Sequence, residues 1–477
     1  MKKTISMLLV VFTLILSACA VDYVTGKRTF NLVSEEQEIQ MGKEADPSIV
    51  AQYGLYQDEK LSSYVNKIGQ RIAQVSQRPN ITYTFRIVDS PIVNAFALPG
   101  GWVYFTRGIL AHFNSEAELA GVMGHEIGHV VARHGAEQMS KQQLAGLGLA
   151  VGSAISPEFE KFSQLAETGI GLLFLKFGRE QESESDRLGV EYSTKLGYDA
   201  HQMADFFKTI ARISESSGSS LPNFLSTHPN PIDREGTVNR LATEWQKKIN
   251  YKPITTTKAD YYKMIDGIVY GADPRQGFVE NNIFKHPDMR FQFPVPDGWK
   301  LNNLPTSVQM ASADDQVYIQ FTMATVEGID AAAEKFIQDN QITPIANRKT
   351  RINGLPAVFV DAEHVTQTQT IRSNTYFIQK DKYTFIFQGL TLSANYNANK
   401  ADMTSVLTGF RELADRSALN KKPSRIRVKT VNSAGSFNNV MKSFGMKNDQ
   451  LSELAILNGV EQNYMYKKGD LVKTISE

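Results

Sequence analysis

Cysteine is almost absent from this 477-residue sequence, since Cys19 is the only one. The chain after Cys19 can therefore form no internal disulfide, and it supplies no thiolate as a metal ligand or nucleophile. An excess of charge of either sign is also missing, because 51 basic residues balance 50 acidic ones. This balance gives no reason to expect the basic surface on which nucleic-acid binding depends, so no nucleic-acid partner is expected.

Long apolar segments are missing as well. Apolar runs occur at residues 7–16, 144–155 and 170–177, and each is shorter than the roughly 20 residues that a membrane-spanning helix needs. We expect the second and third runs to pack as a helical hairpin. The alternative is a mobile flap over an active site.

Residues 1–18 are typical of a bacterial secretion signal, with Lys2 and Lys3 before the apolar run. The run ends in Leu16-Ser17-Ala18-Cys19, which resembles the lipobox of bacterial lipoproteins. This resemblance implies that Cys19 is diacylated and anchors the mature chain to a membrane, facing the periplasm. Because Ala20 rather than an aspartate follows, the outer membrane is favoured over the inner one. The alternative is an ordinary cleaved signal with an incidental cysteine.

The remainder of the sequence predicts a multidomain α+β protein. After a tether at residues 19–33, the first domain covers 34–255 and is mainly helical. A helix-capping pattern begins at Ser34, and apolar residues recur at helical spacing within 61–75 and 116–134. The same domain contains a predicted strand at 81–88, two short extended pieces around Pro99-Gly100-Gly101, and a charged helix at 229–250.

The second half of the sequence changes in character. Residues 256–287 are predicted to be a polar connector. Residues 288–415 alternate like strands and include two helices, and their order of elements resembles PsbP-like domains. Residues 424–477 are predicted as strand, helix, helix, strand, which resembles a degenerate LysM-like module.

The strongest chemical signal is His125-Glu126-Ile127-Gly128-His129 within the helix predicted at 116–134. Residues four apart on a helix are rotated by only about 40°, so both imidazoles project from one face, one turn apart. This separation lets one nitrogen of each ring approach a single metal ion. Glu126 lies beside the first ligand, where its carboxylate can take a proton from a water that the metal activates.

A catalytic zinc site needs a third protein ligand. A histidine at position 135 would complete one known pattern, but Gly135 is there, and His134 is expected to point away from the ligand face. The best candidate lies in Glu182-Ser183-Glu184-Ser185-Asp186. On a second helix Glu182 would bind zinc, and Asp186 would accept a hydrogen bond from a ligand imidazole. Without the upstream histidines, such a cluster would more often be a solvated helix face.

These residues resemble the zinc peptidase family of HtpX and the CAAX prenyl protease, a gluzincin family in which H-E-x-x-H precedes E-x-x-x-D. Further segments match: residues 94–101, Thr106-Arg107-Gly108, Gly197-Tyr198-Asp199, and Ser226-Thr227-His228-Pro229 with Arg234 beyond. The resemblance covers residues 34–250 and is closest to the periplasmic, lipoprotein-type branch. It implies a zincin-type domain with a small edge sheet and one Zn²⁺ per chain. The implied ligands are His125, His129 and Glu182, with Glu126 as the catalytic base.

Two residues beyond the ligands are assigned roles in the reaction. His228 or Arg234 would stabilise the oxyanion that forms at the scissile carbonyl. Pro229 restricts His228 to an extended backbone, and a neutral imidazole is a good zinc ligand. We therefore also expect a latch, in which His228 fills the fourth zinc position and keeps the enzyme inactive. The alternatives are oxyanion stabilisation alone and a loop histidine that merely packs.

The predicted function is hydrolysis of unfolded or misassembled cell-envelope proteins by a zinc endopeptidase. An extended substrate would pair with Asn94, Ala95 and Phe96 through backbone hydrogen bonds, a mode that recognises little side-chain identity. For Asn94 the alternative is a simple turn former. A different class stays open: an envelope chaperone or cell-wall-associated binding protein with a little-used protease site. Its partners would be peptidoglycan or the envelope assembly machinery.

Overall fold

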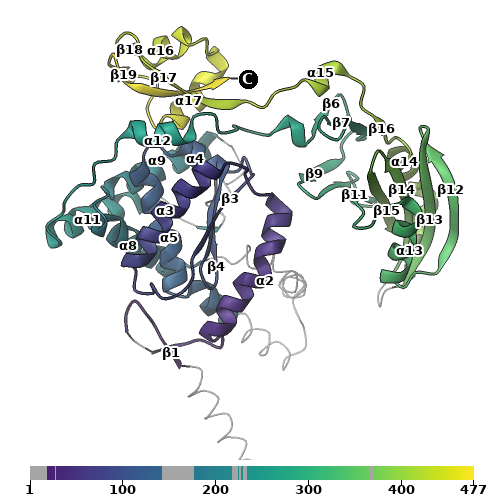
Figure 1. The fold of residues 1–477 in the computed structure, drawn as a ribbon, viewed down its shortest axis with the longest axis horizontal. Helices are drawn as coiled ribbons and strands as arrows, with labels where there is room; N and C mark the ends of the chain where they lie inside the picture. Colours follow the sequence, from purple (N-terminus) through teal and green to yellow (C-terminus); the bar gives the residue numbers. More distant parts are fainter. Residues whose placement is uncertain are drawn as a thin grey trace, which may run out of the picture. The chain divides into compact units, whose positions relative to one another are not determined.

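The computed structural model describes residues 19–26, 28–141, 177–216, 224, 227–228, 234–365 and 369–476. The chain divides into two compact units (Figure 1). Unit 1 combines Met1–Ala272 with Ser424–Glu477, and unit 2 is Asp273–Pro423. The signal at 1–18 and nearly all of the hairpin or flap expected at 144–155 and 170–177 lie outside the described residues. No described helix is long and apolar enough to cross a membrane.

Helices dominate the first part of unit 1. They are α2 (Glu35–Tyr53), α3 (Glu59–Val75), α4 (Arg107–His112), α5 (Glu116–Val131), α8 (Arg179–Lys195), α9 (His201–Ser216), α11 (Arg234–Lys248) and α12 (Lys258–Ile265). The predicted cap is confirmed, because the Ser34 side chain accepts from the backbone of Gln37 and the Gln37 side chain accepts from that of Ser34. Helix α5 also begins where expected, but it ends at Val131 rather than at residue 134.

A three-stranded sheet lies beside these helices in the order β3-β5-β4. Its strands are β3 (Thr84–Val88), β4 (Ala95–Leu98) and β5 (Trp102–Thr106), with β5 parallel to β3 and antiparallel to β4. The turn between β4 and β5 requires glycine at position 100, where φ is 79° and a Cβ would lie 2.4 Å from Cα of Ile39. The two extended pieces predicted around this turn are confirmed, and β4 lies at the edge of the sheet.

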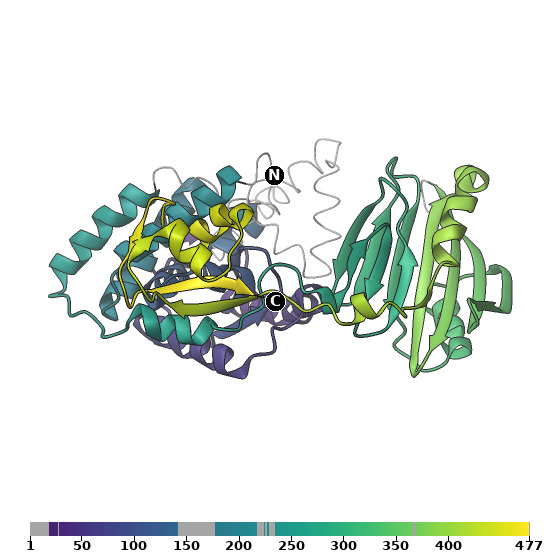
Figure 2. The same cartoon turned by 90° about the horizontal axis from the view of Figure 1, so that it is seen from above.

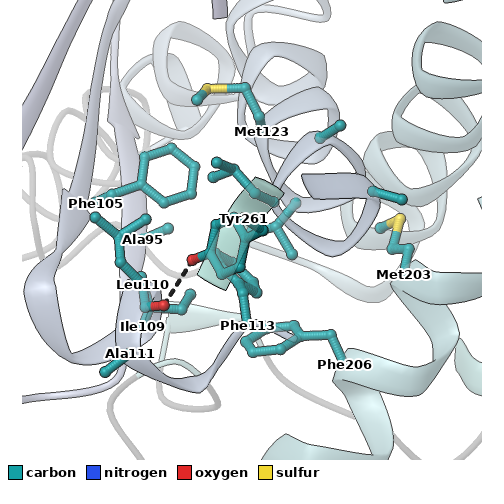
Figure 3. Close-up of a cluster of buried hydrophobic side chains, with 14 of the residues drawn as sticks. Ala95, Phe105, Ile109, Leu110, Ala111, Phe113, Met123, Met203, Phe206 and Tyr261 are labelled. Carbon is teal, nitrogen blue, oxygen red and sulfur yellow. Dashed lines mark hydrogen bonds between the residues drawn. The ribbon is translucent and has the colours of Figure 1, made fainter. Parts of the chain in front are cut away.

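The core of unit 1 surrounds helix α5, all of whose residues are buried. Figure 3 shows part of this core, where Phe105, Leu110 and Met123 gather around Tyr261. The Tyr261 hydroxyl donates a 2.6 Å hydrogen bond to the carbonyl of Leu110. Tyr261 belongs to α12, so part of the segment expected as a polar connector at 256–287 is a packed helix of unit 1.

The C-terminal segment of unit 1 contains the predicted strand, helix, helix and strand, with a small additional strand pair. The elements are β17 (Arg425–Thr430), β18 (Gly435–Ser436), α16 (Phe437–Ser443), η4 (Asn448–Gln450), α17 (Leu451–Leu457), β19 (Met465–Tyr466) and β20 (Leu471–Ser476). Its apolar residues join the same core as α5 and α12. Lys473, fully buried, donates to the carbonyls of Ala111 (2.8 Å) and Phe113 (3.0 Å) at the end of α4. This segment, drawn in yellow in Figure 1, is therefore an integral part of unit 1.

Figure 2 shows the strands of unit 2 in green. They form a seven-stranded antiparallel sheet in the order β12-β13-β14-β15-β11-β10-β9 and a smaller sheet in the order β16-β8-β7-β6. The strands are β6 (Phe278–Glu280), β7 (Ile283–His286), β8 (Phe291–Pro294), β9 (Lys300–Leu304), β10 (Ser307–Ala311), β11 (Tyr318–Met323), β12 (Pro344–Ile352), β13 (Leu355–Val365), β14 (Thr370–Lys380), β15 (Tyr383–Leu392) and β16 (Arg411–Glu412). The helices are η2 (Pro274–Gln276), α13 (Ile329–Asp339), η3 (Ser393–Asn395), α14 (Tyr396–Leu407) and α15 (Arg416–Leu419).

Side chains of the large sheet alternate between two cores. On β13, Ala357 and Phe359 face the core that includes α14 and β8, whereas Val358 and Val360 face the core that includes α13. This alternation is the period of two that a sheet buried on both faces imposes. The strands expected at 291–294, 307–310, 317–322, 357–360, 375–379 and 383–388 are confirmed as β8, β10, β11, β13, β14 and β15. Strands β6, β7, β9, β12 and β16 were not predicted. The multidomain α+β class is therefore correct.

Candidate metal centre

Helix α5 places His125 and His129 on one face, one turn apart. Both side chains are buried, and their Nε2 atoms lie 3.1 Å from each other. The burial follows from the position of α5 in the core, and the shared face follows from the helical repeat. The two histidines thus converge on one point, as the motif predicts.

Helix α8 brings Glu182 to the two histidines because α5 and α8 approach closely at glycines. A Cβ on Gly124 of α5 would lie 3.0 Å from Cα of Gly189 on α8, so larger residues would push the helices apart. Glu182 Oε2 lies 3.6 Å from Nε2 of His125, and its Oε1 lies 3.4 Å from Nε2 of His129. The predicted third ligand therefore lies beside the first two.

A fourth donor comes from His228. Its Nδ1 atom lies 3.0 Å from Oε1 of Glu182 and 3.3 Å from Nε2 of His125. The imidazole stacks on Phe224 with ring centroids 4.8 Å apart, and the backbone N–H of His228 donates to the carbonyl of Phe224. Pro229, which was expected to restrict this residue, lies outside the described residues. The stacking and the backbone hydrogen bond are the contacts seen to hold the ring.

These four side chains fit a tetrahedral metal ion. One donor atom from each lies within 4.8 Å of the others. With Oε1 as the donor of Glu182, four of the six donor pairs lie 3.0 to 3.4 Å apart. Four donors around a tetrahedral zinc, with bonds of roughly 2.0–2.1 Å, would be about 3.3 Å apart. Nitrogen and carboxylate oxygen are also the donors that zinc prefers. The residues present therefore suit zinc in both geometry and chemistry.

The surroundings of His129 and Glu182 favour the protonation states that bind a cation. Burial holds the pKa of His129 well below its ordinary value, which keeps the ring neutral. Burial opposes ionisation of Glu182, but His228, His129 and His125 outweigh it and hold the Glu182 pKa well below its usual range. A neutral imidazole and an ionised carboxylate are the forms in which these groups coordinate metal ions.

Glu126 faces this cluster from the same helix. It is fully buried, and neither carboxylate oxygen has a hydrogen-bond partner among the described residues. Its Oε1 atom lies 3.6 Å from Nε2 of His228. Burial raises the pKa of Glu126, which makes the carboxylate a stronger base. An unpartnered buried carboxylate beside four metal-ligating groups is arranged to receive a proton from a molecule bound there.

Asp186 and Arg234 support the cluster from behind. Asp186 Oδ1 lies 2.9 Å from Nδ1 of His125, which is the contact predicted for it. Arg234 binds both oxygens of Asp186, at 2.7 and 2.6 Å, and its Nη1 lies 3.1 Å from Oε2 of Glu182. Burial opposes ionisation of Asp186, but Arg234 and His125 hold its pKa below the ordinary value. The guanidinium is thus committed to two carboxylates, an arrangement that favours a positioning role over the predicted oxyanion contact.

His134 differs from expectation. The sequence placed it pointing away from the ligands, because five helical steps after His129 correspond to a rotation of about 140°. Helix α5 instead ends at Val131, and Arg133 adopts a φ of 57°. The chain therefore turns back, and Nδ1 of the buried His134 lies 2.9 Å from Nδ1 of His129.

The predicted substrate strand packs against the metal-binding helix. Strand β4 contacts α5 directly, and it pairs with β5 along one of its two edges. Ala95 is fully buried, and the ring of Phe96 stacks on Tyr104 with centroids 4.9 Å apart. Asn94 is buried, and its side-chain oxygen has no hydrogen-bond partner among the described residues. Cys19 lies elsewhere, in strand β1 (Cys19–Val21), which pairs with β2 (Arg28–Phe30).

Three residues near the ligands were not predicted. His134 contacts His129, Glu184 contacts His134, and the ring of Phe177 stacks on His129 with centroids 4.0 Å apart. Glu184 lies within the acidic cluster already noted. It follows the predicted ligand Glu182 by two residues, so it lies on a different side of α8. The only sign of His134 in the sequence was that it is a third histidine close to the motif. Its contact depends on where α5 ends, which the apolar pattern does not determine.

Comparison with known proteins agrees with this geometry. A family model described as peptidase family M48 matches residues 59–241. Mitochondrial metalloendopeptidase OMA1 of Schizosaccharomyces pombe is 30% identical over 233 residues, which cover 47% of this chain and 67% of that protein. A putative beta-barrel assembly-enhancing protease of Vibrio cholerae is 34% identical over 185 residues, which cover 37% of this chain and 38% of that protein.

The beta-barrel assembly-enhancing protease of Escherichia coli is 28% identical over 234 residues, covering 47% of each chain. The chain thus spans less than half of either beta-barrel assembly-enhancing protease. Among solved structures, a cyanobacterial PsbP from Synechocystis covers 27% of this chain with 9% identity and a TM-score of 0.25, a likeness too low to decide the fold. The family match and the 30% identity to OMA1 confirm the resemblance that the motifs suggested: the chain belongs to peptidase family M48.

Proposed function

We propose that this protein is a zinc-dependent endopeptidase that hydrolyses unfolded or misassembled proteins of the bacterial cell envelope. The observation that supports it most is the convergence of His125, His129, Glu182 and His228 beside the carboxylate of Glu126, whose oxygens have no hydrogen-bond partner among the described residues. Membership of peptidase family M48 supports the peptidase activity. The names of the bacterial relatives, beta-barrel assembly-enhancing proteases, support the choice of envelope proteins as substrates.

In this mechanism His125, His129 and Glu182 would hold one zinc ion, and zinc, when bound, supplies a Lewis acid toward water and the scissile carbonyl. Glu126 takes a proton from the attacking water. Because burial raises its pKa, the same carboxyl can hold that proton and then deliver it to the leaving amine. Asp186 and Arg234 keep His125 and Glu182 in place through their hydrogen bonds and ion pairs.

His228 is proposed to have two positions. With Nδ1 near Glu182 and His125, it would fill the fourth coordination position of a bound zinc and leave no room for the attacking water. The enzyme is then latent. When the segment that carries His228 moves outward, water enters, and the imidazole can stabilise the oxyanion. Burial disfavours a charged His228, but in this inward position Glu182 and Glu126 outweigh it and raise the His228 pKa.

The substrate is proposed to bind as an extended strand along β4. This strand lies at the edge of its sheet and packs on the helix of His125 and His129, so a peptide added there would run past the metal. Backbone pairing with Asn94, Ala95 and Phe96 requires an extended chain and little sequence identity. The buried, unpartnered amide oxygen of Asn94 would accept a hydrogen bond from the substrate backbone. Unfolded polypeptides meet these requirements.

We further propose that lipidation of Cys19 anchors the protein to the outer membrane, facing the periplasm. The order of elements in unit 2 supports a PsbP-like domain at residues 288–415, and that of residues 424–477 supports a LysM-like module. Both would add binding surfaces for envelope partners, including peptidoglycan or the assembly machinery. The peptidase domain would occupy residues 34–255, after a signal at 1–18 and a tether at 19–33.

The proposal is tested by separating metal binding from catalysis. Glu126→Gln should retain about one zinc per chain and lose casein cleavage by orders of magnitude, because only the base is removed. His125→Ala and Glu182→Ala should lose zinc as well. Glu180→Gln removes an exposed carboxylate from the same helix as Glu182 and serves as the control. Full casein cleavage by the Glu126 variant contradicts the proposal, and aggregation suppression without any cleavage by the parent protein would favour a chaperone.

A further inference from the structure

The second metal-binding histidine has its own hydrogen-bonded support. Nδ1 of His129 lies 2.9 Å from Nδ1 of His134, and Nε2 of His134 lies 3.3 Å from Oε2 of Glu184. His134 is buried, and the side chain of Glu184 is 25% exposed. A chain of three polar groups therefore runs from the metal cluster toward solvent. It is separate from the pair Asp186 and Arg234, which contacts His125.

The positions of the protons follow from the direction of the rings. His129 presents Nε2 to the cluster, 3.4 Å from Glu182, so its proton lies on Nδ1 and is donated to Nδ1 of His134. His134 must then carry its own proton on Nε2, where Glu184 accepts it. Ser185 Oγ lies 3.4 Å from Nδ1 of His134, a longer contact than that with His129. Each ring nitrogen of His129 and His134 thus has one role in this series of hydrogen bonds.

The backbone is shaped to place His134 there. Arg133 has a φ of 57°, in a region that non-glycine residues rarely adopt. Its guanidinium donates to Oε2 of Glu38 at 2.7 Å and to the carbonyl of Val33 at 2.6 Å. These buried contacts hold the reversal that follows α5. The consequence of the reversal is that the imidazole of His134 returns to the ligand His129.

We propose that His134 and Glu184 are positioning residues that fix the ring of His129 through a hydrogen-bonded chain. The inference rests on the proposed function, because it assigns His129 as a zinc ligand. An outer partner of this kind sets the tautomer and the orientation of the ligand ring, and its loss typically lowers metal affinity about 10–100-fold. Packing offers a competing explanation, since the ring of Phe177 also stacks on His129.

The two explanations separate in a pair of substitutions at one position. His134→Asn keeps an acceptor near Nδ1 of His129, whereas His134→Phe keeps a planar ring and removes every polar atom. Glu184→Gln weakens the outer contact at a partly exposed site, so it remains informative if His134→Phe does not fold. Glu180→Gln, an exposed carboxylate one turn earlier on α8, is the matched control.

The readouts are the rate of zinc release to a chromophoric chelator and the visible absorption of the cobalt-substituted protein. We expect His134→Phe to release zinc about 10–100-fold faster and to change the cobalt spectrum, with His134→Asn and Glu184→Gln between it and the parent. The inference would be overturned if His134→Phe had the same rate of zinc release and the same cobalt spectrum as the parent. It would also be overturned if His134→Phe and His134→Asn had equal defects. If the parent itself bound no metal, the proposed function would fail instead.

Discussion

Nδ1 of His228 lies 3.0 Å from Oε1 of Glu182, although 46 residues separate the two in sequence. The contact puts His228 in the same cluster as the three predicted ligands, His125, His129 and Glu182. A catalytic zinc needs one position open to water, and His228 is placed to occupy that position. This is the arrangement that the proposed latch requires in the latent enzyme.

Replacing His228 by alanine tests this latch. We expect His228→Ala to keep zinc and to show several-fold higher basal casein cleavage, because the fourth position is then open to water. Lower cleavage with zinc retained would instead support oxyanion stabilisation alone. Unchanged activity and unchanged thermal stability would contradict the latch. Packing against Phe224 would then be the only remaining explanation for the position of His228. Zinc content and initial rates of cleavage are the measurements.

Cys19 should carry the membrane anchor. Cys19→Ala is expected to accumulate as an unprocessed precursor, because in the proposed lipoprotein the cysteine would be both the acylation site and the first residue after cleavage. One acyl chain alone binds membranes only marginally, whereas several chains anchor stably. The measurements are gel mobility, incorporation of labelled palmitate and membrane fractionation, with Ala20→Ser as the control. Normal processing and release of the Cys19 variant would show that the lipobox interpretation is wrong.

Unit 2 should be removable, whereas the C-terminal segment should not. The backbone N–H of Tyr270 donates a 2.8 Å hydrogen bond to the carbonyl of Ser424, so a short Gly-Ser linker can replace Asp273–Pro423. This variant is expected to fold and to bind zinc.

Deletion of Ser424–Glu477 is the matched comparison. It would expose apolar residues that are fully buried in unit 1, including Ile426, Phe437 and Leu454. Each large apolar side chain contributes about 1.5–3 kcal/mol when buried, and a whole domain is stable by only about 5–15 kcal/mol. The truncated chain should therefore be insoluble or unfolded by circular dichroism. A soluble, zinc-binding truncation would contradict the assignment of this segment to the core.

His286 predicts acid sensitivity in unit 2. Burial lowers the pKa of His286 to about 4, and its Nδ1 accepts a hydrogen bond from the backbone N–H of Met289. Because the folded pKa is below the ordinary value near 6.5, the stabilising effect of the neutral ring is complete above pH 6.5. It is lost as the pH falls through 4, and it amounts to about 3 kcal/mol.

His286→Asn keeps an acceptor for Met289 and removes the titrating ring. Amide hydrogen exchange in β7 and β8, corrected for intrinsic rates, should show a smaller loss of protection between pH 7 and pH 4.5 in this variant than in the parent. Equal losses in the two proteins would contradict the prediction. Exchange in unit 2 is the suitable probe because metal release at low pH acts on unit 1.

The sequence predicted those parts of the site that depend on local geometry. His125 and His129 share a face because the helical repeat alone requires it. Asp186 follows Glu182 by one turn of α8, so its contact with a ligand ring could also be predicted. The approach of α8 to α5 could not, because it depends on Gly124 and Gly189 meeting across two helices. Only the resemblance to a known family supplied it.

Other contacts depend on residues too distant in sequence for local patterns. The end of α5 depends on Arg133 binding Glu38, 95 residues earlier, and this contact reverses the expected direction of His134. The packing of the last strand depends on Lys473 reaching the carbonyl of Ala111, 362 residues away. A polar composition similarly suggested a connector at 256–287, where Tyr261 and Tyr262 are buried. Composition averages over a segment and misses single buried side chains within it.

The core of unit 1 is built from segments that leave the ribosome far apart in time. Residues on α5 and α12 are synthesised before unit 2, and residues on β17, α16, α17 and β20 are synthesised after it. Lys473 and its carbonyl partners on α4 meet only when almost the whole chain has been made. The helix that carries His125 and His129 therefore gains its final packing last. A ribosome-bound fragment that ends before residue 424 contains the complete zinc motif without the part of the core that residues 424–477 contribute.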